Sequence, residues 1–164
     1  MSKTTFITGA NKGLGFETAR RLTELGHTVL LGARDEGRGR RAAAGIGARF
    51  VPLDVTDDAS VAAAAADVAG VEGRIDVLIN NAGIAGNVGP VEELTGAETA
   101  RVLDTNVAGI VRVTAAFLPL LRASDAPAVV NVTSGLGSVA LTHDPERVES
   151  QVIATAYAAS KAAV

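Results

Sequence analysis

The feature that most constrains the fold is a glycine-rich segment between a short β-branched run and a helical stretch. The run Thr4 to Thr8 has strand propensity, and Gly9, Gly13 and Gly15 follow it in the segment Thr8-Gly9-Ala10-Asn11-Lys12-Gly13-Leu14-Gly15. Glycines permit a tight turn and a close approach of the backbone to a phosphate, and a helix N-terminus offers free N–H groups and a positive dipole end. Isolated glycines would indicate only a turn, but a strand, a glycine turn and a helix in this order predict a nucleotide site.

Short β-branched runs alternate with longer helical segments along the chain, which indicates an α/β protein. The predicted strands are Thr4 to Thr8, Thr28 to Gly32, Arg49 to Leu53, Val77 to Asn80 and Val129 to Thr133. The predicted helices are Leu14 to Leu25, Ser60 to Val71 and Ala97 to Arg122, the last of them kinked. Helical crossovers make the strands parallel, so we expect a Rossmann-like, doubly wound sheet with helices on both faces. We expect residues 1–164 to form a single domain.

One further segment has only a weak helical pattern, because it contains several glycines. The stretch from Asp35 to Gly47 contains Gly37, Gly39, Gly45 and Gly47, and each glycine inside a helix costs about 1 kcal/mol relative to alanine. We therefore expect this helix to be short and mobile.

Charge and composition exclude several classes of function. The formal net charge of −3 gives no basic field for a phosphate backbone, so we expect no nucleic-acid partner. The sequence has no cysteine, which excludes a thiolate metal site, and we predict no metal. No apolar run approaches the ~20 residues that span a bilayer, and the N-terminus has no signal-peptide pattern. We expect no membrane partner and a cytoplasmic location.

The residue that follows the second predicted strand indicates which dinucleotide binds. In Rossmann folds an acidic residue here accepts a hydrogen bond from the ribose 2′-hydroxyl of NAD. This chain has Arg34 instead, whose guanidinium can bind a 2′-phosphate, and Lys12 in the glycine turn adds a second positive charge. The two positive charges favour NADP(H) over NAD(H). The alternative is that Lys12 and Arg34 are ordinary solvated surface cations, and the negative charge of Asp35 beside Arg34 would oppose binding of a 2′-phosphate.

Several motifs in order resemble those of short-chain dehydrogenases/reductases. The spacing Thr-Gly-x-x-x-Gly-x-Gly resembles the glycine loop of that family, Asn80-Asn81-Ala82-Gly83 resembles its motif after the fourth strand, and Tyr157-Ala158-Ala159-Ser160-Lys161 resembles its tyrosine–lysine motif. The resemblance covers the chain from residue 5 to its end. The pairs Asn11-Lys12 and Ala33-Arg34 and a long interval from Ser134 to Tyr157 are most similar to the carbonyl reductase branch.

The resemblance implies a cofactor site for NADP(H). Asp54 would accept from the adenine amino group and the Val55 N–H would hold the ring edge, although Asp54 is also typical of a turn or cap carboxylate. Lys161 would hold the hydroxyls of the nicotinamide ribose. The residues implied to bind the cofactor are Gly9, Asn11, Lys12, Gly13, Leu14, Gly15, Arg34, Asp54, Val55, Asn81, Tyr157 and Lys161.

The resemblance also implies four catalytic residues: Asn106, Ser134, Tyr157 and Lys161. Tyr157 and Lys161 are four residues apart and share a helix face. A phenol with a pKa of ~10 needs about 4 kcal/mol of stabilisation to ionise near pH 7, and the Lys161 ammonium and the oxidised nicotinamide ring are the cations that can supply it. Ser134 would donate to the substrate oxygen, and Asn106 would kink its helix and hold a water of the proton relay. His143 is predicted to be a surface histidine and not a catalyst, and a serine hydrolase site of Ser134 with His143 is excluded because Ser134 lacks the Gly-x-Ser-x-Gly context.

The sequence thus predicts an NADPH-dependent oxidoreductase that transfers hydride between the nicotinamide and a small carbonyl or alcohol substrate, with Tyr157 as proton donor or acceptor. The alternatives are a non-catalytic NADP-binding module or inactive fragment and, disfavoured by Arg34 and by the Tyr157 and Lys161 pair, a methyltransferase. Family members are longer than this chain, which ends at Val164. We therefore expect the sheet to lack its last strands, an apolar edge at Ala128 to Thr133, low stability and low activity. The resemblance implies a homo-oligomer for a full-length form, an expectation we do not extend to the shorter chain.

Overall fold

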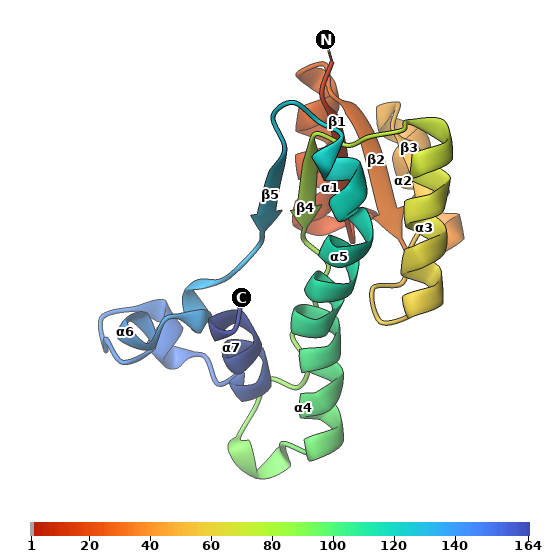
Figure 1. Cartoon of the computed structure of the whole chain (residues 1–164). Coiled ribbons are helices and arrows are strands. Elements are labelled where there is room, and N and C mark those ends of the chain that lie inside the picture. The colour runs from red at the N-terminus through yellow and green to blue at the C-terminus, as the bar shows by residue number, and fades with distance from the viewer. Residues whose placement is uncertain (1) are drawn as a thin grey trace. The chain divides into compact units, whose positions relative to one another are not determined.

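The computed structural model describes residues 2–164 (Figure 1). The chain forms two compact units. Unit 1 comprises the residues up to Ala82 together with Val111–Asn131, and unit 2 comprises Gly83–Ile110 and Val132–Val164.

Unit 1 contains a parallel sheet of five strands in the order β3-β2-β1-β4-β5. Two of the predicted strands match the observed bounds, two differ by one residue at one end, and the fifth differs by one residue at its start and two at its end. The observed strands are β1 (Thr4–Thr8), β2 (Thr28–Ala33), β3 (Arg49–Pro52), β4 (Val77–Asn80) and β5 (Ala128–Asn131). The direction of chain travel across the sheet reverses beside β1, and in open α/β sheets ligands bind at the carboxyl ends of the strands at such a point.

Helices cover both faces of this sheet, as predicted (Figure 1). The side chains of Phe6, Leu30 and Leu78 lie on one face, where β1 pairs with β2 and β4, and pack with α3 (Asp58–Val71) and the part of α5 (Gly109–Arg122) that belongs to unit 1. The rings of Phe6 and Phe117 have centroids 4.5 Å apart. The other face carries α1 (Gly13–Glu24) and α2 (Glu36–Ile46).

The prediction that the second helical segment would be short is wrong, because α2 is a regular helix of 11 residues. Asp35 caps its N-terminus by accepting a hydrogen bond from the Arg38 N–H, and Gly47 ends it in the left-handed conformation with φ of 70°. Gly47 therefore lies outside the helix, where glycine is favourable. Gly39 packs so closely under the ring of Phe50 that a side chain at this position would overlap it.

The predicted helix from Ala97 to Arg122 is observed as one continuous helix, Gly96–Arg122. It consists of α4 (Gly96–Leu103), a π-helical turn (Asp104–Ala108) and α5, so the predicted irregularity is a π-turn. By length and composition alone this helix could span a membrane, with a mean hydropathy of 1.2 over a window of 18 residues, of which 28% is buried within the structure. Val113 and Phe117 of this helix are buried in the core of unit 1.

Unit 2 is built around α4, the π-turn and the short helix α7 (Thr155–Ala162), which packs against α4. A 3-10 turn at Gly135–Gly137 also packs against α7. The remaining elements are the 3-10 turns Val91–Glu93 and Val148–Gln151 and the four-residue helix α6 (Val139–Thr142).

Candidate active site

The glycine turn of unit 1 is fastened to the end of β4. The hydroxyl of Thr8 accepts hydrogen bonds from the backbone N–H groups of Asn81 and Ala82, at 3.0 and 2.9 Å. The Asn81 side-chain amide donates to the carbonyls of Thr8 and Gly9, at 2.9 and 3.2 Å. Gly9 has φ of 65°, and a Cβ there would lie 2.9 Å from the Cα of Ala82, while a Cβ at Gly15 would overlap the Asn81 amide. The turn therefore requires glycine on steric grounds, and Asn81 supports its backbone.

Four of the residues predicted to bind the cofactor lie at the surface of this turn. Lys12 is exposed and precedes the first residue of α1, Asn11 is half-buried, and Leu14 is 65% exposed. Gly13 has φ of 57°, and a Cβ there would meet no atom within 4 Å. The N-terminus of α1 thus presents an open, cationic surface to which an anion can be attracted.

Arg34 lies at the same edge of the sheet. The register pairs Thr8 with Gly32, so Arg34 follows β2 beside the glycine turn, where its side chain is exposed. The neighbouring Asp35 carboxylate is engaged by Arg38, whose backbone N–H and Nε donate to it at 2.8 and 2.7 Å. These hydrogen bonds lower the pKa of Asp35 below its ordinary value, so the acid beside Arg34 is bound to a different arginine.

The predicted adenine contact, Asp54, forms a tight turn. Its Oδ1 accepts from the backbone N–H and the hydroxyl of Thr56, at 3.0 and 2.7 Å, and its own N–H donates to the Ser60 hydroxyl. Burial opposes ionisation of the carboxyl, but the two bonds from Thr56 and the charge of Arg34 outweigh it and lower the pKa of Asp54. The carboxylate is therefore a turn acceptor, and its charge is present near neutral pH.

Lys161 is the most buried cation of the predicted site. The residue is 7% exposed and its Nζ donates to the Val132 carbonyl at 2.6 Å. The same Nζ lies 5.7 Å from the centroid of the Tyr157 ring, so the two side chains share a face of α7. Burial lowers the pKa of Lys161. The Thr133 hydroxyl donates to the Lys161 carbonyl at 3.1 Å. Val132 therefore holds the side chain of this lysine, and the next residue, Thr133, holds its backbone.

Ser134 follows directly on Thr133 and begins the Gly135–Gly137 turn. Its side-chain oxygen accepts from the Leu136 N–H at 3.3 Å, which leaves the hydroxyl proton as its donor group. A Cβ at Gly137 would come 2.6 Å from the carbonyl of Lys161, so the turn that carries Ser134 packs directly on the end of α7.

Asn106 is fully buried in the π-turn, and its side chain makes three hydrogen bonds. Oδ1 accepts from the Ile84 N–H, and Nδ2 donates to the Ile84 carbonyl and to the Ser160 hydroxyl, each at 2.9 Å. A Cβ at Gly83 would lie 3.3 Å from Asn106 Oδ1 and 3.8 Å from Lys161 Nζ. Unit 2 therefore brings Asn106, Tyr157 and Lys161 into one hydrogen-bonded and packed cluster.

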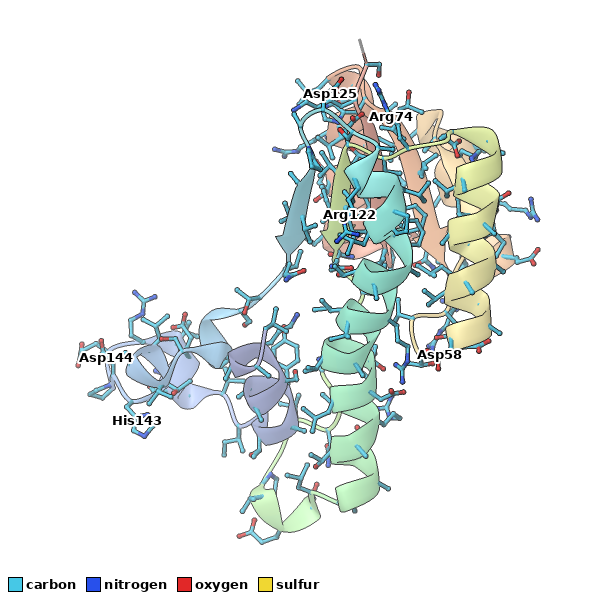
Figure 2. All side chains as sticks on the ribbon, viewed as in Figure 1. Asp58, Arg74, Arg122, Asp125, His143 and Asp144 are labelled. Carbon is cyan, nitrogen blue, oxygen red and sulfur yellow. The ribbon has the colours of Figure 1, made fainter. Side chains whose placement is uncertain are left out.

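Two features were missed in the sequence, namely the buried hydroxyl of Ser160 and the backbone carbonyl of Val132. A polar residue between Tyr157 and Lys161 was a signal for the first, whereas backbone acceptors have no sequence signal. His143 is exposed at the end of α6, as predicted, with Nδ1 2.9 Å from the Val139 carbonyl (Figure 2). Among residues 2–164, no group of three or more histidine, aspartate or glutamate side chains is arranged to hold a metal ion.

The parallel sheet and the glycine turn at the carboxyl end of its first strand define the class of Rossmann-like α/β proteins. Comparison with known proteins gives the family within that class. The sequence model of the short chain dehydrogenases matches residues 3–164. The chain belongs to the short-chain dehydrogenase/reductase family of oxidoreductases.

Curated relatives match most of this chain. The short-chain dehydrogenase anuI of Penicillium roqueforti is 40% identical over 169 residues, covering 96% of this chain and 67% of the relative. The (+)-neomenthol dehydrogenase of Arabidopsis thaliana is 36% identical over 159 residues, covering 81% of this chain and 54% of the relative. The chain thus spans about half to two thirds of the length of these relatives.

Solved structures are similar over almost the whole chain. A short chain dehydrogenase from Shigella flexneri complexed with NADP has a TM-score of 0.86 and 30% identity, covering 98% of this chain and 66% of the other. An NAD⁺-bound xylitol dehydrogenase has a TM-score of 0.84 and 31% identity, covering 98% of this chain and 60% of the other. Nicotinamide cofactors of both kinds therefore occur in proteins with this fold.

Proposed function

We propose that this chain is the cofactor-binding and catalytic portion of an NADPH-dependent oxidoreductase that interconverts a carbonyl and an alcohol. The observation that carries the proposal is the buried Lys161 ammonium beside the ring of Tyr157 on one face of α7. When bound, the nicotinamide supplies or accepts the hydride. The residues of the chain position the reactants and move the proton.

The cofactor residues fit a phosphorylated dinucleotide. The glycine turn excludes side chains where the backbone would approach the pyrophosphate, and Lys12 and Arg34 are exposed at the same edge of the sheet. Arg34 is available for a 2′-phosphate because the neighbouring Asp35 is engaged by Arg38. Since similar structures hold NADP in one case and NAD⁺ in another, the preference for NADP(H) rests on these charges.

Tyr157 is the proposed proton donor and acceptor. The Lys161 ammonium stabilises its phenolate by charge. In the reductive direction the Tyr157 phenol donates its proton to the substrate oxygen. Ser134 retains a hydroxyl proton with which to stabilise negative charge on that oxygen. Asn106 belongs to the proton relay, and its π-turn keeps its amide fixed beside α7.

The proposed substrate is a small carbonyl or alcohol. The Arabidopsis relative is named as a dehydrogenase of neomenthol, an alcohol, which supports this class. The pairs Asn11-Lys12 and Ala33-Arg34 favour the carbonyl reductase branch. We further propose that the chain acts as one dinucleotide-binding domain in the cytoplasm, and that the full-length form is a homo-oligomer.

Tyr157→Phe tests the proposed chemistry, because it removes the acidic proton and keeps the ring that packs near Lys161. The variant is expected to abolish NADPH oxidation with ketones, aldehydes and quinones, and to leave NADPH binding by fluorescence titration unchanged. Phe16→Tyr, on α1 in unit 1, is a control for the aromatic exchange itself. Turnover by Tyr157→Phe would remove Tyr157 from the proton step. NADPH binding by the wild-type protein without turnover of any such substrate would favour the non-catalytic binding module.

A further inference from the structure

Ser160 lies on α7 between Tyr157 and Lys161 and has no exposed surface. Its hydroxyl oxygen is 2.7 Å from the Tyr157 carbonyl and 2.9 Å from Asn106 Nδ2. An amide nitrogen only donates, so Ser160 accepts from Asn106 and its single proton goes to the carbonyl. The structure thus fixes the direction of both hydrogen bonds.

The same logic fixes the orientation of the Asn106 amide. The Ile84 N–H requires an acceptor, which places Oδ1 opposite it, and the Ile84 carbonyl requires a donor, which places Nδ2 there. One proton of Nδ2 is used by Ile84 and the other by Ser160. Every polar atom of the Asn106 side chain therefore has a partner, and Ser160 is the one that lies on α7.

We infer that Ser160 is a positioning residue for the proton transfer. Its hydroxyl holds the Asn106 amide and the backbone of Tyr157 in fixed places relative to each other. This inference rests on the proposed function. Alanine at position 160 would leave one N–H of Asn106 without a partner in a buried site, so the amide and the π-turn that carries it would relax. The substitution removes no atom predicted to touch the cofactor or the substrate.

Ser160→Ala is expected to lower kcat about tenfold, the effect of losing one hydrogen bond between neutral groups. The Kd for NADPH and the KM for the substrate are expected to remain unchanged. Ser150→Ala is a matched control, because the Ser150 hydroxyl makes the same type of bond to a carbonyl three residues earlier, that of Arg147 at 2.8 Å, but is exposed. The control is expected to keep the wild-type kcat.

A double-mutant cycle separates positioning from general loosening of α7. If Ser160 acts through Asn106, adding Ser160→Ala to Asn106→Ala lowers kcat less than the same change lowers it in the wild-type protein. Equal losses in both backgrounds would overturn the inference. A Ser160→Ala variant with a lower melting temperature but the wild-type kcat would overturn it too, by showing a purely structural role.

The outcomes also distinguish this inference from the proposed function. If the wild-type protein oxidises NADPH with a carbonyl substrate and Ser160→Ala does so equally fast, only the role of Ser160 is refuted. If the wild-type protein turns over none of the carbonyl substrates, the proposed function is refuted and the positioning role is refuted with it.

Discussion

Arg34 determines the predicted preference for NADPH by its charge. Arg34→Asp places a carboxylate where a 2′-phosphate would lie, and losing a charged hydrogen-bond pair costs about 1.5–3 kcal/mol, or a factor of about ten to a hundred in affinity. NADPH binding is expected to weaken by at least this factor, whereas NADH binding is expected to change little. Fluorescence titration of both cofactors measures the difference, with the exposed Arg41→Asp on α2 as a control. Equal losses for both cofactors would refute the 2′-phosphate assignment.

Lys161 gives the stability of the protein a predictable pH dependence. Burial lowers its pKa in the folded state, so the unfolded chain holds this proton more tightly. The cost of burying the ammonium is fully present below the folded pKa and disappears as the pH rises from that value to the unfolded pKa of ~10.4. The wild-type protein should therefore gain stability relative to Lys161→Met across this alkaline window.

Urea unfolding of both proteins at a series of pH values from neutral to alkaline checks this prediction. The exposed Lys3→Met is a control in which no such relative gain is expected. A difference in unfolding free energy between wild type and Lys161→Met that is constant over the window would contradict the burial argument.

At the residue scale, the sequence predicted that Tyr157 and Lys161 share a helix face, but it did not predict which atoms hold Lys161 in place. Tyr157 and Lys161 share a face because helical periodicity places positions four apart together. The hydrogen bond from Lys161 to the Val132 carbonyl could not be predicted from the sequence, since every residue provides a backbone carbonyl. The partnership of Ser160 with Asn106 joins positions 54 residues apart, and a single sequence contains no signal for such a pairing.

At the scale of elements, strands were predicted well because β-branched runs bounded by turns leave few alternatives. Helix α2 was predicted poorly because propensity counts glycines without their surroundings. Gly39 contributes a close contact with Phe50, and Gly47 contributes a left-handed cap, so two of the glycines favour the helix. Tertiary packing thus overrode local propensity in this segment.

The glycines of α2 can be separated experimentally. A Cβ at Gly45 would meet no atom within 4 Å, so Gly45→Ala is expected to stabilise the protein by about 0.5–1 kcal/mol through helix propensity. Gly39→Ala introduces the same methyl group under Phe50 and is expected to destabilise by about 1–3 kcal/mol through overpacking. Thermal and urea unfolding of the two variants measure both effects. Stabilisation by Gly39→Ala would show that Phe50 moves aside at no cost.

At the scale of the whole molecule, the predicted cofactor and catalytic residues fall largely into different units. The glycine turn, Arg34 and Asp54 belong to unit 1, whereas Asn106, Ser134, Tyr157 and Lys161 belong to unit 2. The sequence could not predict this division, because it depends on which segments pack together. Unit 2 is formed by two separate stretches of chain, and the second follows directly on β5.

The outer strand β5 has consequences for how the 164-residue chain behaves in solution. It pairs only with β4 within the sheet of the described residues, and Val129 and Val130 are 44% and 45% exposed. An apolar strand with unpaired backbone groups at a sheet edge is a template for pairing with another chain. The 164-residue chain is therefore expected to self-associate as its concentration rises. Val130→Lys should suppress this association, because a charge on an edge strand opposes pairing between copies.

Sedimentation velocity at increasing protein concentration measures the association of both proteins. Val71→Lys, which places the same charge on an apolar side chain exposed at the end of α3, is the control and should associate like the wild-type protein. If the control and Val130→Lys both reduce association equally, net charge and not the β5 edge governs it. If the wild-type chain stays monomeric at all concentrations, the exposed edge of β5 does not template pairing.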